Sequence, residues 1–415
     1  MENRKKVELL APAGDLERLK IAVAYGADAV YIGGKSFGLR AKAKNFDIPD
    51  MEEGIRFAHE HGVKVYVTAN IFAHNKDLEP MKEYLKTLEE IGADAFIISD
   101  PGVFMLAKEV APDTEIHVST QANNTNYQSA IFWYNLGARR IVVARELSLD
   151  EIREIRSKIP EDMEIEAFIH GAMCISYSGR CLLSNYLTQR DSNQGDCAQP
   201  CRWKYHLVEE TRPDTYLPIE ENDRGTFIFN SKDMNLIGYI PELIEAGISS
   251  FKIEGRMKTH NYVAALVKAY RQAIDDYYED PELYRRNIGK YYAETEKVSH
   301  RIYSTGFYFG NPDSEGQIYE NSSYKRDYDF IAIVHKDYNP ETGRAVIMQK
   351  NKFCVGDEIE VLPAKGEVFT MTVTKLINQI GEEVSSAPHP HEILEMEFPR
   401  PVHEMDILRK VSDKN

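Results

Sequence analysis

Four of the five cysteines in this chain lie within one short stretch, where they could together bind a metal. The four are Cys174, Cys181, Cys197 and Cys201, whereas Cys354 stands alone in a predicted β-strand of a second domain. Four thiolates can fill a tetrahedral zinc site or hold an iron–sulfur cluster. The stretch has no Cys-x2-Cys pair and is rich in glycine, which favours an iron–sulfur cluster over structural zinc or four unligated thiols.

Polar side chains also follow the predicted strands, all at the same end. These residues are Asn70, Asp100, Gln121, Arg145, His170, Glu254 and Arg256. Taken singly, each could be a solvated loop residue, but together they predict a pocket. Arg145 and Arg256 suit a carboxylate ligand, because a guanidinium group pairs with it through two hydrogen bonds.

His170 and Glu166 are candidate proton carriers. His170 directly follows the predicted strand that contains Glu166, four residues earlier, so strict alternation predicts that both side chains face the same way. Glu166 could instead be the buried partner of an arginine.

Two local segments are basic although the chain as a whole is acidic. One contains Arg202 and Lys204, and the other contains Lys252 and Lys258, with tyrosine and tryptophan residues nearby. Basic and aromatic side chains together can hold phosphates and stack unpaired bases. The alternative is a set of solvated faces.

A repeated pattern of a helix, a glycine and a short apolar strand runs through the first 260 residues. Strands that are apolar on both faces are typical of a parallel sheet covered by helices. In all, eight strands are predicted with helices between them, which favours a TIM-type (β/α)8 barrel, whose active site lies at the carboxyl ends of the strands. The predicted strands are 7–11, 28–32, 63–68, 95–98, 115–119, 140–144, 164–169 and 250–254.

The unusually long gap after the seventh strand predicts an insertion that carries the cysteines. We therefore expect a barrel domain at residues 1–277, with the cysteine cluster and a small β-element inserted at about 171–235. Residues 278–326 are expected to be an irregular connector. Short strands from about residue 327 predict a small C-terminal all-β barrel at 327–412.

Composition narrows the class of protein. The chain has 415 residues, of which 43% are hydrophobic and 28% charged, so a disordered or low-complexity protein is excluded. A net charge of −16 argues against a surface that binds nucleic acid everywhere. The sequence contains neither a membrane-length apolar run nor a secretion signal, so we expect a cytoplasmic protein without membrane contact.

The cysteine segment resembles that of the collagenase-like peptidase family U-thirty-two. It reads EAFIHGAMC, then SGRC, then NQGDCAQPCRW. The similarity continues in residues 9–14, 119–121, 231–233, 252–258 and 304–307, and so covers nearly the whole chain.

The resemblance implies a function that the residues alone do not give. Family members with one C-terminal β-barrel are implicated in making 5-hydroxyuridine at the wobble position of tRNA, without oxygen and dependent on prephenate. The resemblance also implies a 4Fe-4S cluster on Cys174, Cys181, Cys197 and Cys201, and makes a paralogous partner subunit plausible. Relatives that hydroxylate ribosomal RNA or a quinone precursor are alternatives, and so is the peptidase activity of the family name.

These observations combine into one hypothesis. The chain is expected to hydroxylate tRNA through an iron–sulfur cluster, with prephenate as a small co-substrate. The expected catalytic residues are His170, Glu166, Arg145, Arg256 and Glu254. The expected substrate-binding residues are Asn70, Gln121, Arg202, Lys204, Lys252 and Lys258, and the C-terminal barrel is expected to dock the rest of the tRNA.

Overall fold

The computed structural model describes most of the chain. The described residues are 6–35, 37–38, 45–173, 181, 183–190, 192, 196–202, 208–209, 212–216, 221–222, 225–226, 231–310 and 325–412, and for 202–230 only backbone elements are described. Among the described helices, none combines the length and apolar character that a membrane span requires.

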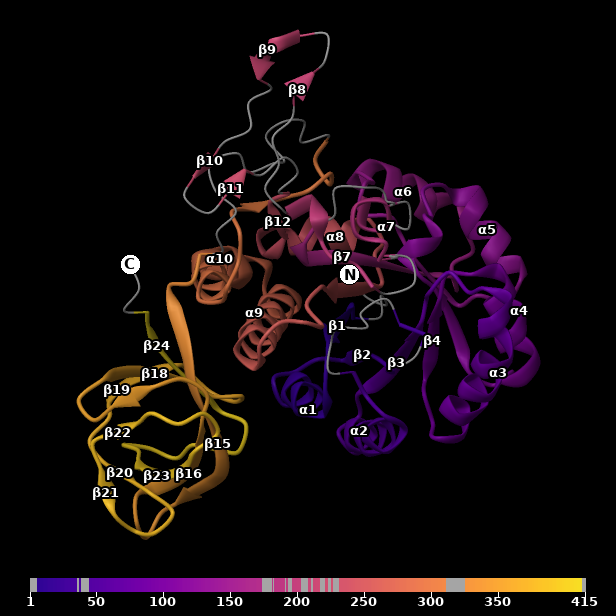
Figure 1. Ribbon diagram of the computed structural model, residues 1–415. Coiled ribbons are helices and arrows are strands. Elements are labelled where there is room, and N and C mark those ends of the chain that lie inside the picture. Colours follow the sequence, from indigo (N-terminus) through magenta and orange to yellow (C-terminus); the bar gives the residue numbers. More distant parts are fainter. Residues whose placement is uncertain are drawn as a thin grey trace.

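The predicted barrel is confirmed (Figure 1). Parallel strands pair in the order β13-β1-β2-β3-β4-β5-β6-β7, and β7 pairs with β13 to close the ring. These strands are β1 (Glu8–Pro12), β2 (Ala29–Gly33), β3 (Lys64–Ala69), β4 (Ala95–Ile98), β5 (Glu115–Val118), β6 (Arg140–Val142), β7 (Glu164–Ala172) and β13 (Ser250–Ile253). Each observed strand overlaps one predicted from the sequence.

Helices between the strands form the outer layer. They are α1 (Leu16–Ala24), α2 (Ile48–Glu60), α3 (Asn75–Glu90), α4 (Pro101–Val110), α5 (Tyr127–Asn135), α6 (Leu149–Lys158), α8 (Ile240–Glu245) and α9 (His260–Glu279). Polar side chains such as Asp15 and Thr259 cap their first turns by accepting backbone N–H bonds. Gly26 and Gly137 follow helices with φ of 102° and 97°, a conformation that glycine adopts without strain.

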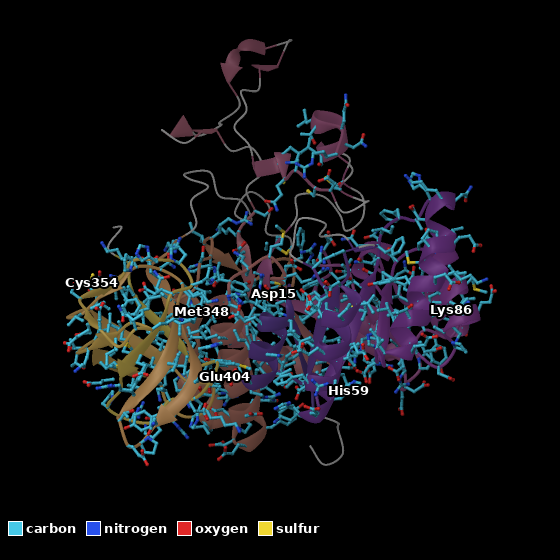
Figure 2. All side chains as sticks on the ribbon, turned by 60° about the horizontal axis from the view of Figure 1, so that its bottom comes forward. Asp15, His59, Lys86, Met348, Cys354 and Glu404 are labelled. Carbon is cyan, nitrogen blue, oxygen red and sulfur yellow. The ribbon has the colours of Figure 1, made fainter. Side chains whose placement is uncertain are left out.

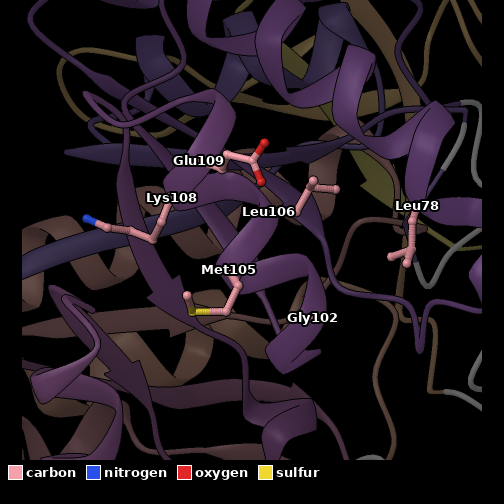
Figure 3. Close-up of a pocket in the computed structure, with 6 residues that line it drawn as sticks. All are labelled: Leu78, Gly102, Met105, Leu106, Lys108 and Glu109. Carbon is pink, nitrogen blue, oxygen red and sulfur yellow. The ribbon is translucent and has the colours of Figure 1, made fainter.

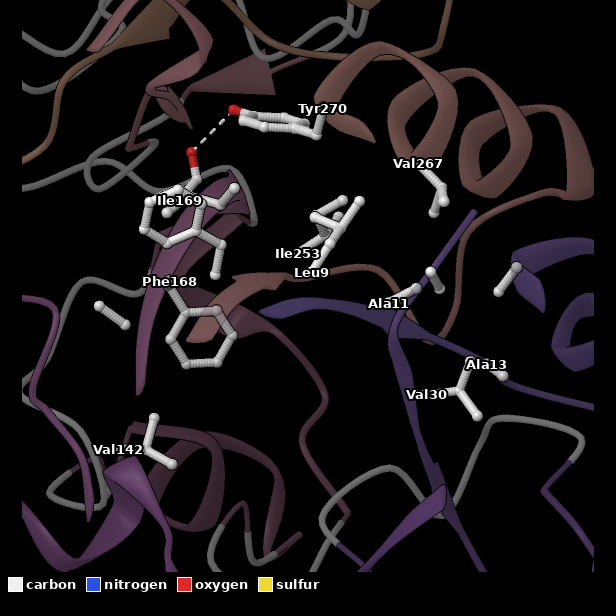
Figure 4. Packing of buried hydrophobic residues seen from close by; sticks show 14 of the residues in the cluster. Leu9, Ala11, Ala13, Val30, Val142, Phe168, Ile169, Ile253, Val267 and Tyr270 are labelled. Carbon is white, nitrogen blue, oxygen red and sulfur yellow. Dashed lines mark hydrogen bonds between the residues drawn. The ribbon is translucent and has the colours of Figure 1, made fainter. Parts of the chain in front are cut away.

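Two kinds of core fill the barrel. Between strands and helices the packing is apolar, as Figure 4 shows for Leu9, Ile253 and Val267. Tyr270 of α9 adds a hydrogen bond there by donating to the carbonyl of Ile169, at 3.1 Å. Inside the ring, apolar residues such as Leu10 occupy one side, whereas charged residues of β1, β6, β7 and β13 meet on the other.

The insertion follows β7. It includes α7 (Leu183–Thr188), the short strands β8 (Val208–Glu209), β9 (Arg212–Tyr216), β10 (Glu221–Asn222) and β11 (Gly225–Thr226), and then β12 (Asp233–Asn235). The β8–β9 hairpin projects away from the barrel (Figure 1), whereas β12 returns to pair antiparallel with the end of β7. The short strand β14 (Tyr303–Ser304) then pairs with β12.

The expectation of an irregular connector at 278–326 is wrong for its first part. Residues Pro281–Glu296 form helix α10, which packs on α9. Asp280 caps it, and Pro281 occupies its first turn, where a missing N–H costs nothing. Its buried side chains include tyrosines such as Tyr284 and Tyr291. The buried apolar residues of this helix are therefore aromatic and not aliphatic.

The C-terminal unit is an antiparallel sheet that curls into a half-barrel, in agreement with the predicted all-β domain. Its strand order is β19-β18-β24-β15-β16-β23-β20-β21, with β17 and β22 paired separately. The strands are β15 (Tyr328–Asn339), β16 (Arg344–Gln349), β17 (Phe353–Cys354), β18 (Glu358–Leu362), β19 (Phe369–Thr372), β20 (Leu376–Ile377), β21 (Glu383–Val384), β22 (Ser386–Ala387), β23 (Ile393–Glu397) and β24 (Ile407–Val411). In Figure 2, Cys354 lies in this unit, whereas His59 and Lys86 lie on barrel helices.

The C-terminal unit shares a core with the barrel. Phe330, Ile333, Leu362 and Ile407 belong to the same apolar cluster as the barrel side chains. Beside them Arg409 is fully buried, with Nη1 2.7 Å from Glu294 Oε1 on α10 and Nε 2.6 Å from Glu360 Oε1. The two units are therefore joined by packing as well as by charge.

Candidate functional site

A polar pocket opens where the barrel strands end. Its cavity volume is about 60 Å³. Its lining comes from β2, β3, β4, β6, β7 and β13 and from the segments after β3, β5, β6 and β13: Tyr31, Thr68, Asn70, Ile97, Ser119, Thr120, Gln121, Val142, Arg145, Phe168, Lys252, Glu254 and Arg256. Six residues predicted from the sequence meet here, namely Asn70, Gln121, Arg145, Lys252, Glu254 and Arg256.

Arg256 is held in place by hydrogen bonds to Asn45 and Thr68, in a space that Gly33 leaves open. Its Nη2 donates to Asn45 Oδ1 at 2.7 Å and its Nη1 to Thr68 Oγ1 at 3.3 Å, and the residue is only 4% exposed. A Cβ atom on Gly33 would lie 2.0 Å from Nη2, so only glycine leaves room for the guanidinium. Arg18 supports the loop from behind by donating to the carbonyl of Arg256, at 3.1 Å.

Arg145 and Lys252 make the pocket cationic on the same side. The guanidinium of Arg145 donates to the carbonyl of Ala172 at 2.9 Å and lies 5.0 Å from the centre of the Phe168 ring. Lys252 reaches the pocket from β13. The carboxylate of Glu254 also lines the pocket, and the Tyr31 hydroxyl donates to it at 3.4 Å.

Neutral groups line the side of the pocket across the barrel from β13. Asn70 donates through Nδ2 to Ser119 Oγ at 3.4 Å, and Ser119 Oγ also accepts from the backbone N–H of Gln121 at 3.2 Å. The buried Asn70 Oδ1 has no hydrogen-bond partner among the described residues. Thr68, Ser119 and Tyr31 also line the pocket but were not predicted as binding residues, because in the sequence each is an ordinary strand or turn residue.

Glu166 lies in the barrel interior and does not line the pocket. It is fully buried and forms ion pairs with Arg140, at 3.1 Å, and Lys252, at 2.6 Å. The interpretation of Glu166 as a buried partner of an arginine is thus confirmed. Arg140 itself was not singled out in the sequence, because it begins an apolar strand.

The predicted common orientation of His170 and Glu166 is wrong. A register shift between Lys252 and Ile253 pairs Lys252 with Phe168 but Ile253 with His170, which breaks the alternation. His170 therefore lies outside the pocket lining, with Nδ1 3.2 Å from Tyr270 Oη and Nε2 3.4 Å from Tyr303 Oη. Burial, with the nearby charges of His300 and Lys258, lowers the pKa of His170 to about 3, so the ring is neutral at neutral pH. A role for His170 in proton transfer stays a prediction.

Three of the four clustered cysteines fall within the described residues, and Cys174 lies outside them. Cys181 precedes α7, and Cys197 and Cys201 flank the start of a short 3-10 helix at Pro200–Arg202 that packs on α7. The backbone N–H of Gln199 points to Cys197 Sγ at 3.4 Å. No group of three metal-ligating side chains is assembled among the described residues, a set that omits Cys174. Thiols that receive N–H donors suit an iron–sulfur cluster, since such bonds tune its sulfurs.

The remaining predicted binding residues either do not line the pocket or lie outside the part of the chain that the structure describes. Lys258 donates from Nζ to the carbonyl of Ser299 at 3.2 Å and lies 5.1 Å from the centre of the Tyr262 ring. Lys204 lies outside the described residues, and for Arg202 only the backbone is described.

A second hollow lies on the outer surface, between α3 and α4 (Figure 3). Leu78, Met105 and Leu106 give it an apolar lining, with Lys108 and Glu109 beside them. None of the predicted site residues lines it.

Comparisons with known proteins place the chain in a family. The model of Peptidase family U32 matches residues 14–318, and the model of the Peptidase family U32 C-terminal domain matches residues 326–409. The chain is 44% identical to tRNA hydroxylation protein P1 of Bacillus subtilis, over 98% of this chain and 95% of that protein. It is 38% identical to tRNA hydroxylation protein P of Escherichia coli, over 92% of each.

A third relative is named for a different substrate. It is the 23S rRNA 5-hydroxycytidine C2501 synthase of Escherichia coli, 39% identical over 71% of this chain and 44% of that protein. With both family models matched in order along the chain, this protein belongs to peptidase family U32.

Proposed function

We propose that this chain is an enzyme that hydroxylates tRNA, converting the wobble uridine to 5-hydroxyuridine. Relatives named for tRNA hydroxylation match the barrel and the C-terminal unit together, over nearly their full length. The observation that carries the proposal is the polar pocket at the barrel mouth, directly beside the strand that leads into the cysteine segment. Barrels of this kind place their chemistry at this face.

The pocket supports a small carboxylate as co-substrate, and we assign prephenate to it. Arg145, Lys252 and Arg256 supply three cations, against the single carboxylate of Glu254. Prephenate carries two carboxylates, which guanidinium groups bind with fixed geometry. Asn70 and Gln121 can hydrogen-bond its remaining oxygens from the other side of the pocket.

A 4Fe-4S cluster would be held by Cys174, Cys181, Cys197 and Cys201. When bound, it would supply one-electron redox chemistry, which suits hydroxylation better than amide hydrolysis. The chain's own residues bind and orient the co-substrate, and the buried guanidinium of Arg256 fixes one end of it. Glu254, the carboxylate of the pocket, is placed to accept a proton from a bound ligand.

Ribosomal RNA is the second candidate substrate. The relative named for 23S rRNA supports it, but this chain covers less than half of that protein. The two tRNA-directed relatives described above match over 92% or more of each chain, which favours tRNA.

Nucleoside analysis tests the proposal. We expect tRNA from a strain that lacks this gene and any paralogue to contain no 5-hydroxyuridine, and the wild-type gene to restore it. Cys174→Ser should not restore it, and anaerobically purified protein should lose its iron and sulfide with that change. Unchanged tRNA with altered 23S rRNA would move the assignment to ribosomal RNA. Peptide cleavage that persists without the four cysteines would support a protease.

A further inference from the structure

A single carboxylate inside the barrel binds two cations at once. Glu166 has no exposed surface, and its Oε1 lies 2.6 Å from Lys252 Nζ while its Oε2 lies 3.1 Å from Arg140 Nη1. Burial alone would raise its pKa, but the charges of Lys252 and Arg140 outweigh burial and hold the pKa below its ordinary value. Glu166 is therefore a carboxylate whose two oxygens each have their own cation.

Lys252 connects this ion pair to the pocket. Its ammonium lies 4.4 Å from the centre of the Tyr31 ring and 5.4 Å from that of Phe168, while Glu166 binds it from below. Such contacts fix the ammonium on an otherwise flexible four-carbon chain. Lys252 is only 4% exposed, and it lines the pocket. The small surface that it keeps therefore faces the pocket.

Arg140 holds Glu166 in position independently of Lys252. Besides Glu166, it binds Glu8 at 2.7 Å and Glu164 at 2.6 Å, so its guanidinium is fixed by three carboxylates. Arginine does not release its proton in proteins, so this column of charges does not conduct protons. It can only hold its members in position.

We propose that Glu166 is a positioning residue, which fixes Lys252 so that its ammonium binds an anionic group of the ligand at the pocket floor. Glu166 itself touches neither ligand nor pocket. The identity of the ligand as a carboxylate rests on the proposed function, whereas the dependence of Lys252 on Glu166 does not.

Glu166→Gln tests this role, with Glu164→Gln as its matched control. Both changes remove one carboxylate bound to Arg140, but only Glu166 contacts Lys252. The first measurement is the side-chain ammonium signal of Lys252 by NMR, in full-length protein with isotope-labelled lysine, assigned by its absence in Lys252→Arg. We expect a sharp, slowly exchanging signal in the wild type and in Glu164→Gln, and its loss in Glu166→Gln.

The second measurement is the affinity for prephenate by calorimetry. We expect Glu166→Gln to weaken binding by about fivefold or more and Glu164→Gln by less than about twofold. If Glu166→Gln keeps both the signal and the affinity, the proposal is overturned. If the wild type does not bind prephenate but the signal still depends on Glu166, the positioning role stands and the proposed co-substrate fails.

Should Glu166→Gln not fold, Glu166→Asp replaces it. Aspartate keeps the charge but withdraws it from Lys252 by one methylene. A sharp Lys252 signal and full prephenate affinity in that variant would equally overturn the proposal.

Discussion

The guanidinium of Arg256 occupies space that any side chain at position 33 would fill. A Cβ there would lie 2.0 Å from Nη2 and 2.5 Å from Cζ, at the movable end of a long side chain. We therefore expect Gly33→Ala to displace Arg256 without unfolding the barrel. Loss of a charge-assisted hydrogen bond to the ligand should weaken prephenate binding by about tenfold to a hundredfold, as calorimetry would measure.

Gly289→Ala is the control for this change. Gly289 lies on the exposed face of α10, where an added Cβ meets nothing within 4 Å. Prephenate binding should be unchanged in that variant. Equal binding by Gly33→Ala and wild type would mean that Arg256 does not hold the ligand.

Glu8 makes the stability of the barrel depend on pH. Burial opposes its charge, but the charge of Arg140 and hydrogen bonds from Arg140, Tyr66 and Ser250 lower its pKa from 4.5 to about 2. Because the pKa is lower in the folded state, this stabilisation is complete above about pH 4.5 and is lost as pH falls towards 2. The shift corresponds to about 3 kcal/mol.

Urea unfolding at a series of pH values measures this contribution. Between about pH 5 and 2 the unfolding free energy of the wild type should fall with a slope that includes one proton from Glu8. In Glu8→Gln that slope should be smaller by about one proton, and the protein less stable at neutral pH. Parallel curves for the two proteins would show that Glu8 titrates alike in both states.

At the scale of elements, helix α10 contains one position that lowers its stability. Gly289 costs helix stability because glycine loses more backbone freedom on folding than alanine does. Gly289→Ala should raise the free energy of unfolding by about 0.5–1 kcal/mol, measured by urea denaturation. A decrease would mean that α10 needs glycine there for a reason other than space.

Strands and pocket-lining loops were predictable because their signals are local. Each barrel strand is a short apolar run, which in five of the eight follows a glycine. The polar residues at the strand ends meet because parallel strands share one end. The orientation of His170 was not predictable, because one shift of register against Lys252 and Ile253 reverses its face. Nor does the sequence reveal Gly33 as part of the site, since that role depends on Arg256, more than 200 residues away.

At the scale of the whole molecule, Arg409 joins the two units. Its side chain is buried against Glu294 of α10, which packs on the barrel helix α9, and against Glu360 of its own sheet. Arg409→Met would remove the arginine that pairs with both carboxylates at the buried contact between the two units. Removing one partner of a buried ion pair typically lowers the free energy of unfolding by about 3–5 kcal/mol. We expect a lower unfolding midpoint and faster proteolysis between the units. Arg400→Met, on the exposed face of the same unit, should change neither; a similar loss there would mean that the effect is not specific to the joint.

The charge of the molecule limits how it can bind tRNA. Residues 327–412 contain nine Lys and Arg but fifteen Asp and Glu, and the whole chain has a net charge of −16. Phosphate contacts must therefore come from few cations, and the predicted ones are Arg202, Lys204 and Lys258. Each neutralised phosphate contributes roughly −0.9 to the slope of log affinity against log salt, so three contacts predict a slope of about −3.

Replacing these three cations by glutamine tests this limit. The slope should flatten nearly to zero, whereas glutamine at Arg56 and Lys86, on the outer helices α2 and α3, should leave it near −3. Filter binding over a range of salt concentrations measures both. A wild-type slope of about −6 or steeper would require further basic contacts, and an unchanged slope in the triple variant would place the phosphate contacts elsewhere. Either result would show that Arg202, Lys204 and Lys258 are not by themselves the phosphate-binding surface.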